Sequence, residues 1–179
     1  MFQSGNISVG SLLALADAES PLLSGGEVSV ADHVMAFAVC SFDGSEAASP
    51  GFLASRRFRR RCLKLAKAYR GRMDLVRRDA AAFAQRLKDA LHGPRVAVEK
   101  DRKGGDGVPI GWGLLAVYLA IFGGSRADVL RMPAHDAILQ ISYYNVLAGR
   151  AQLISGGRAK LLDQIAARRA AKKAAEKVA

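Results

Sequence analysis

The fold of this chain is decided by residues 58–91, which read FRRRCLKLAKAYRGRMDLVRRDAAAFAQRLKDAL. Ten apolar positions recur there at steps of three or four: Phe58, Cys62, Leu65, Tyr69, Met73, Val76, Ala80, Phe83, Leu87 and Leu91. Such steps place every apolar side chain on one face of an α-helix. The His-Gly-Pro sequence at residues 92–94 is typical of a helix end. The pattern predicts one long amphipathic helix over residues 50–93, with Pro50 in its first turn.

The composition of the rest of the chain also favours helix. Half of the 179 residues are apolar, alanine is abundant, and threonine is absent. Alternating runs of β-branched residues, which are typical of strands, are nearly missing. We therefore expect an all-α fold, a small helical bundle with one long amphipathic basic helix, short N-terminal helices and a helical C-terminal tail.

The expected organisation is one helical domain over residues 1–157, followed by a basic Ala/Lys-rich helical tail over residues 158–179. The domain divides into an acidic N-terminal helical part (1–49), the long basic helix (50–93), a mobile linker (94–109) and apolar helices (110–157). The helices expected outside the long one are 7–18, 30–42, 110–122, 126–131 and 134–154. Ser29 with Asp32, and Ser125 with Asp128, have the spacing of N-terminal caps.

Charge is strongly segregated along the chain. Residues 1–55 carry a net charge of −6 and contain no lysine or arginine, whereas residues 56–103 carry +12. Residues 104–157 are neutral and residues 158–179 carry +5, within an overall charge of +11. Such a separation is typical of two surfaces that attract each other, in one molecule or between two.

The basic segment is the candidate binding site for a partner or a polyanion. Its residues are Arg56, Arg57, Arg59, Arg60, Arg61, Lys64, Lys67 and Arg70. Three interpretations stay open: a face that is either solvated or paired with the acidic N-terminal segment, a site for a protein partner, or a nucleic-acid site. The nearby aromatic residues lie on the apolar stripe, so they are used in packing and not as stacking platforms for bases.

The sequence offers little that a catalyst needs. His33, His92 and His135 fall in different predicted elements and have no ligand spacing with Cys40 or Cys62, so we expect no metal. No carboxylate pair, P-loop or nucleophile elbow is present. Residues 111–116, GWGLLA, fit a dinucleotide-binding pattern, but they follow a polar loop instead of a strand. The prediction is a protein that is not an enzyme, with no cofactor and with buried free thiols.

The apolar stretch at residues 110–122 is too short to cross a membrane. Thirteen helical residues span about 20 Å, against a hydrocarbon core of about 30 Å. The first fifteen residues lack the positive charge that begins a signal peptide. We therefore expect no membrane partner and a cytoplasmic location, in the host cytoplasm if a phage encodes the chain.

Several passages together resemble phage and prophage tail assembly chaperones. They are the helix at 7–16, the stretch SPLLSGGEVSVAD at 20–32 with the apolar helix that follows it to 39–41, the Trp-bearing helix at 112–122, Gly-Gly-Ser at 123–125, DVLRMP at 128–133, and a helix with Tyr143 and Tyr144. The resemblance covers about half of the chain. The basic residues 56–78 have no counterpart in it.

The resemblance implies a small, helical, non-catalytic protein. Proteins of this kind bind a helical tape-measure protein, keep it soluble and help tail tube subunits assemble around it, and they are absent from the finished particle. The partners would be a tape-measure-like helical client and the tail tube protein. A homo-oligomer is a further possibility that the sequence leaves open, and the alternative function is nucleic-acid binding through residues 56–78.

Overall fold

The computed structural model describes residues 7–94, 96–98 and 108–153, and most of them are helical. The predicted all-α fold is confirmed. The chain divides into two compact units, one of Met1–His92 with Gly104–Ile141 and one of Gly93–Lys103 with Ser142–Ala179. The tail expected at 158–179 lies outside the described residues.

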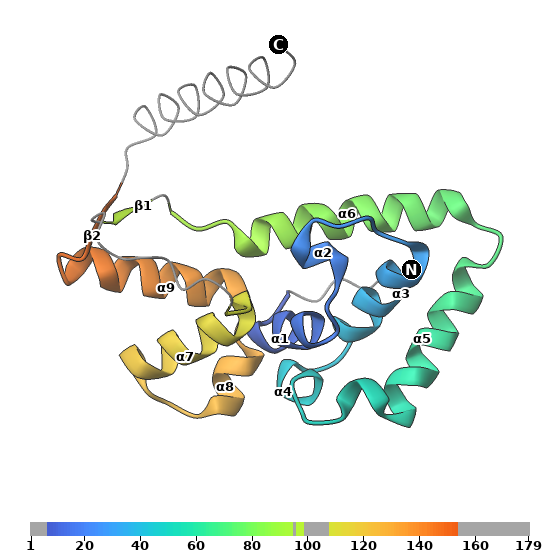
Figure 1. Ribbon diagram of the computed structural model, residues 1–179, viewed down its shortest axis with the longest axis horizontal. Coiled ribbons are helices and arrows are strands. Elements are labelled where there is room, and N and C mark those ends of the chain that lie inside the picture. The colour runs from blue at the N-terminus through green and yellow to red at the C-terminus, as the bar shows by residue number, and fades with distance from the viewer. Residues whose placement is uncertain (1–6, 95, 99–107, 154–179) are drawn as a thin grey trace, which may run out of the picture. The chain divides into compact units, whose positions relative to one another are not determined.

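Helices make up the described part of the first unit (Figure 1). Their bounds are α1 Val9–Asp17, α2 Pro21–Ser24, α3 Val30–Val39, α4 Gly44–Ala47, a 3₁₀ turn Phe52–Ala54, α5 Arg56–Tyr69, α6 Met73–Leu91, α7 Ile110–Phe122, α8 Arg126–Arg131 and α9 Ala134–Leu147. Helix α9 leaves this unit after Ile141. The caps expected at Ser29 and Ser125 are confirmed, because each hydroxyl accepts a hydrogen bond from the backbone N–H three residues later.

Helix α1 is the centre of the first unit. Its residues from Val9 to Leu15 are all buried, and it contacts α3, α4, α7 and α8. Backbone hydrogen bonds from Val9 N–H to the Met132 carbonyl and from Ala134 N–H to the Ile7 carbonyl tie its start to the junction of α8 and α9. An apolar helix buried on most sides needs such neighbours around it.

The prediction of one long helix over residues 50–93 is wrong. The structure has two helices instead, α5 and α6, which turn sharply at Gly71 and both pack against α3 (Figure 1). Gly71 has φ +71°, a left-handed conformation that glycine adopts without strain. The periodic pattern of apolar residues continues across the turn because each helix packs its own apolar stripe into the same core. Met73 lies at the turn itself and is 51 % exposed.

Two further segments differ from the prediction. Residues 43–50 contain α4, which Asp43 caps by accepting a hydrogen bond from Ser45 N–H, and α5 begins only at Arg56, behind the Ser55 cap. In the second unit, β1 Val96–Val98 pairs antiparallel with β2 Ala151–Leu153. The helix expected at 134–154 therefore ends at Leu147, and part of the expected 94–109 linker is a strand.

Helix α7 has the expected bounds and is apolar on all sides, yet only Gly111 and Leu115 are buried in it. Trp112 donates a hydrogen bond from Nε1 to Asp17 in α1, at 3.3 Å, and Val117 and Phe122 remain largely exposed. Among the described residues, no helix combines the length and the apolar character that crossing a membrane requires.

Two glycines give a test of this packing. Gly10 in α1 lies directly against the backbone of Gly44 in α4, and an added Cβ would overlap the Gly44 carbonyl. Because backbone must move, Gly10→Ala should lower the free energy of unfolding by about 1–3 kcal/mol, measured by urea denaturation. Gly113→Ala in α7 is the control, since a Cβ there meets nothing within 4 Å and should add about 0.5–1 kcal/mol of stability. Equal effects of the two changes would contradict the packing of α1 on α4.

Candidate partner-binding groove

An open apolar depression lies between α3, α5 and the turn that joins α5 to α6. Its volume is about 560 Å³. The residues that line it are Val30, Ala31, Val34, Met35, Cys62, Leu63, Ala66, Tyr69, Arg70, Gly71 and Met73. We call this depression the α3–α5 groove.

The walls of the groove expose apolar side chains that a folded core would normally cover. Leu63 is 62 % exposed, Met73 51 % and Val30 41 %. Leu63 is exposed because it lies outside the apolar stripe, whose members Phe58 and Leu65 point into the core. Burying a side chain of this size contributes about 1.5–3 kcal/mol, so the groove has a substantial unused capacity to bind an apolar surface.

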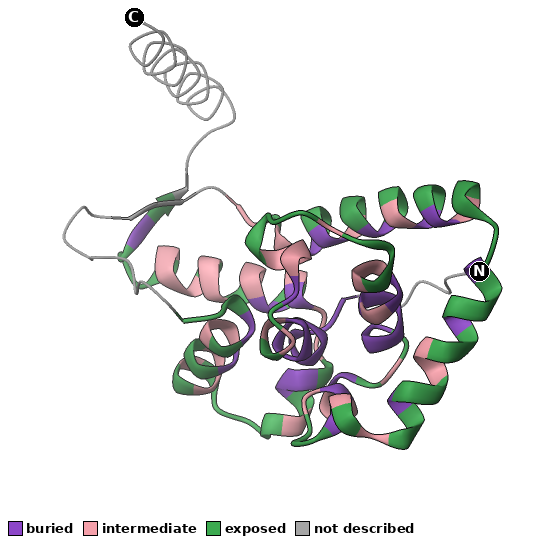
Figure 2. Ribbon diagram, turned by 45° about the vertical axis from the view of Figure 1, so that its right-hand side comes forward, coloured by how far each residue is buried: buried purple, intermediate pink, exposed green. Residues whose placement is uncertain are grey.

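The basic residues predicted as a site all lie on α5 or, for Arg70, at its C-terminal cap. The helix has seven basic residues among fourteen and no acidic one, and its outward face is exposed (Figure 2). Positive side chains in the first turn of a helix are not neutralised by the helix dipole, which is itself positive at that end. The face is therefore strongly electropositive.

Two of the predicted residues turn toward the acidic N-terminal segment. Arg57 makes an ion pair with Glu46, and its guanidinium lies 5.2 Å from the centre of the Phe42 ring. Arg61 Nε donates a hydrogen bond to Ser41 Oγ at 3.0 Å. Of these two contacts, the one between Arg57 and Glu46 is a pairing of opposite charges between the acidic and basic segments, whereas Arg61 contacts an uncharged residue of the acidic segment.

The other six predicted residues project into solvent. They are Arg56, Arg59, Arg60, Lys64, Lys67 and Arg70. Within the part of the chain that the structure describes, their side chains make no ion pair or hydrogen bond. Arg70 also lines the α3–α5 groove, so the basic face and the groove are one continuous surface.

A buried polar contact holds the α5–α6 turn that closes the groove. Tyr69 Oη donates a hydrogen bond to Asp79 Oδ2 at 2.9 Å, and Arg78 lies 3.2 Å from the other carboxylate oxygen. Both Tyr69 and Asp79 are buried. Burial, and then the hydrogen bond to Asp79, raise the pKa of the Tyr69 hydroxyl far above its ordinary value. The sequence pattern does not reveal this pair, because in one straight helix over residues 50–93 Tyr69 and Asp79 would lie about 15 Å apart.

The groove carries no group with the properties of a nucleophile. Cys62 lines it, but partial burial raises the pKa of its thiol, and burial raises that of Cys40 to about 12, whereas a reactive cysteine needs a lowered pKa. Both thiols are free, as predicted, but only Cys40 is buried, and Cys62 is partly exposed. Among the described residues, no cluster of histidine, cysteine or carboxylate side chains has a geometry that could hold a metal ion.

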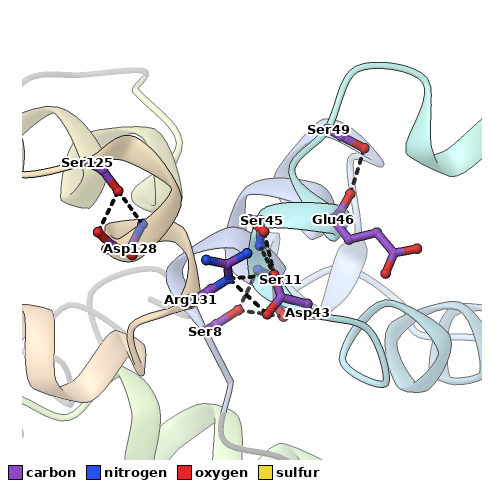
Figure 3. A network of polar contacts seen from close by, with 9 residues as sticks. All are labelled: Ser8, Ser11, Asp43, Ser45, Glu46, Ser49, Ser125, Asp128 and Arg131. Atoms are coloured by element: carbon purple, nitrogen blue, oxygen red, sulfur yellow. Dashed lines mark hydrogen bonds and ion pairs between the residues drawn. The ribbon is translucent and has the colours of Figure 1, made fainter.

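His33, His135 and several exposed carboxylates have structural partners. His135 Nδ1 donates a hydrogen bond to the His92 carbonyl at 2.8 Å, and His33 packs against Phe37. Figure 3 shows Arg131 of α8 in an ion pair with Asp43 at the start of α4, at 3.2 Å. The hydrogen bond from Ser45, together with that ion pair, lowers the pKa of the Asp43 carboxyl.

The groove was not predicted, although one signal for it is present in the sequence. Leu63 is an apolar residue off the stripe, and basic residues stand at the neighbouring helical positions 59, 60 and 67. Its other wall, α3, could not be placed against α5 from the pattern alone. No protein-family model, curated protein or solved structure matches this chain.

The Tyr69–Asp79 contact can be tested through stability. Tyr69→Phe should lower the free energy of unfolding by about 1–3 kcal/mol, because the buried Asp79 carboxyl loses a hydrogen-bond donor. Tyr143→Phe, at an exposed position, should change it by less than about 0.5 kcal/mol. Urea denaturation at neutral pH measures both.

The pH dependence of the same variants checks the pKa of Tyr69. The unfolded chain ionises its tyrosines near pH 10, while the folded protein keeps Tyr69 protonated to higher pH. Its contribution to stability is therefore complete below about pH 10 and is lost as the pH rises further. The wild type should lose more stability than Tyr69→Phe between about pH 9 and 11, and parallel profiles would contradict the raised pKa.

Proposed function

We propose that this chain is a non-enzymatic assembly factor that binds helical protein partners in the α3–α5 groove. The observation that carries the proposal is the open apolar groove with Leu63 exposed at its edge. The resemblance to phage tail assembly chaperones supports the same role. The client would be a long helical protein of the tape-measure type, bound in the host cytoplasm during tail assembly.

The groove suits an amphipathic helix better than a small, rigid ligand. It is open along one side, and its walls come from two helices, so an elongated apolar stripe can lie between them. Met35 and Met73 line it, and flexible methionine side chains adapt to apolar residues of different shapes. A chaperone that meets successive segments of one long client needs that tolerance.

The proposal predicts a loss of client binding when a charge enters the groove. Leu63→Asp should reduce affinity for the helical client at least about tenfold, since the burial of the leucine is lost. The measurement is co-expression with the longest helical protein encoded nearby, followed by co-purification and by the soluble yield of that client. Leu147→Asp is the matched control, because Leu147 is 87 % exposed and lies outside the groove.

Two results would contradict the proposal. One is a client that stays as soluble with Leu63→Asp as with the wild type. The other is a long helical neighbour that the intact chain neither binds nor keeps soluble. Circular dichroism of Leu63→Asp is the check on the fold. We expect an unchanged helical spectrum, because the side chain of Leu63 is exposed.

The second candidate function is nucleic-acid binding, which the six exposed basic side chains of α5 favour. It predicts tight binding to a random DNA duplex at low salt, with an affinity that falls steeply as salt is added and a slope that indicates several phosphate contacts. The proposed function predicts that little duplex is retained at about 0.15 M salt. Strong retention there, lost when Arg56, Arg60 and Lys64 are changed to glutamine, would favour the second candidate.

A further inference from the structure

We propose that the helix bound in the α3–α5 groove carries acidic residues at both ends of its apolar stripe, about three helical turns apart. This inference rests on the proposed function, since it requires that the groove binds a helix. It comes from four residues of α5 and its cap that follow one line: Arg59, Leu63, Ala66 and Arg70.

The spacing of these residues defines the partner. They stand at positions i, i+4, i+7 and i+11, which lie on one face of a helix. Eleven residues at 1.5 Å each separate Arg59 from Arg70 by about 16 Å along the axis. The two apolar residues of the groove wall therefore have a guanidinium beyond each end. A partner helix laid along this line meets apolar surface at its centre and positive charge at both ends.

Neither Arg59 nor Arg70 makes an ion pair with an acidic residue within the described part of the chain. Helix α5 contains no acidic residue. On the opposite wall, Asp32 is already used in the cap of α3, where its carboxylate accepts hydrogen bonds from the backbone N–H and the hydroxyl of Ser29 at 2.8 and 2.7 Å. These hydrogen bonds lower the pKa of the Asp32 carboxyl, and they hold this side chain at the N-terminal cap of α3.

Partial desolvation of these arginines favours acidic residues in the partner. A helix that covers Leu63 and Ala66 also covers Arg70, which lines the groove, and passes beside Arg59, which lies one helical turn before Leu63 on the same face. A cation that loses water without gaining an opposite charge opposes binding. A neutral or basic helix would therefore bind more weakly than an acidic one. A phosphate backbone would satisfy the arginines but would leave the apolar centre uncovered.

The test uses three synthetic helices of equal length, each with a leucine and a methionine at the centre of its apolar stripe. The first has glutamates eleven positions apart, on the side of the stripe. In the second, both glutamates are moved two positions along, which turns them by about 200° to the opposite face. The third has glutamine in place of the first helix's glutamates. Fluorescence anisotropy with the intact chain measures the three affinities.

We expect the first helix to bind about five- to tenfold more tightly than the other two, with a preference that declines as salt is added. The double variant Arg59→Gln/Arg70→Gln should remove the preference. The variant Arg77→Gln/Lys88→Gln on α6 has the same net charge and should keep it, because neither residue lies on the face of α5 that contains Arg59 and Arg70. This pair of variants separates a local contact from general attraction to a basic protein.

The outcomes distinguish the two proposals. Equal binding of all three helices, abolished by Leu63→Asp, would overturn the acidic partner and leave the proposed function standing. Binding of none would count against both. Self-association of the chain that Leu63→Asp abolishes would make a second copy the occupant and would also overturn the acidic partner.

Discussion

The packing of Phe37 is the interaction on which the first unit depends. Its ring is fully buried, and it lies 6.0 Å from the Tyr69 ring and 5.4 Å from the Phe83 ring. Aromatic pairs at these distances are favourable beyond the area that they bury. Since Phe37 belongs to α3, Tyr69 to α5 and Phe83 to α6, this one contact holds three helices together. It also places one wall of the α3–α5 groove beside the other.

The groove exists because each of these helices packs one face into the core and leaves apolar residues exposed on another. Helix α5 uses Phe58, Leu65 and Tyr69 for the core, so Leu63 and the basic residues are left outside. The turn at Gly71 lets α6 cover α3 from a second direction instead of extending α5. A chain that continued straight at this point would carry its apolar stripe away from Phe37. The turn therefore serves the core and leaves the groove open at the same time.

Fold class and most helix positions could be predicted from the sequence, because local signals determine them. Ser29 and Ser125, each with an aspartate three residues later, mark helix starts that the structure confirms. The turn at Gly71 was missed because the apolar period runs through it unchanged, and a glycine between two arginines is a weak signal beside ten matching positions. The pairing of β1 with β2 joins segments more than fifty residues apart, which no local pattern records. The candidate basic residues lie together on α5 and its cap, but the groove beside them depends on tertiary contact with α3.

Hydrogen–deuterium exchange tests the central claim most directly. The intact chain is measured alone and with its helical client. Binding in the groove should slow exchange in α3 near residues 30–35 and from Cys62 in α5 through the turn to Met73, since these segments line the groove. Slowed exchange confined to α7 or to the outer turns of α6, with α3 and α5 unchanged, would contradict the account.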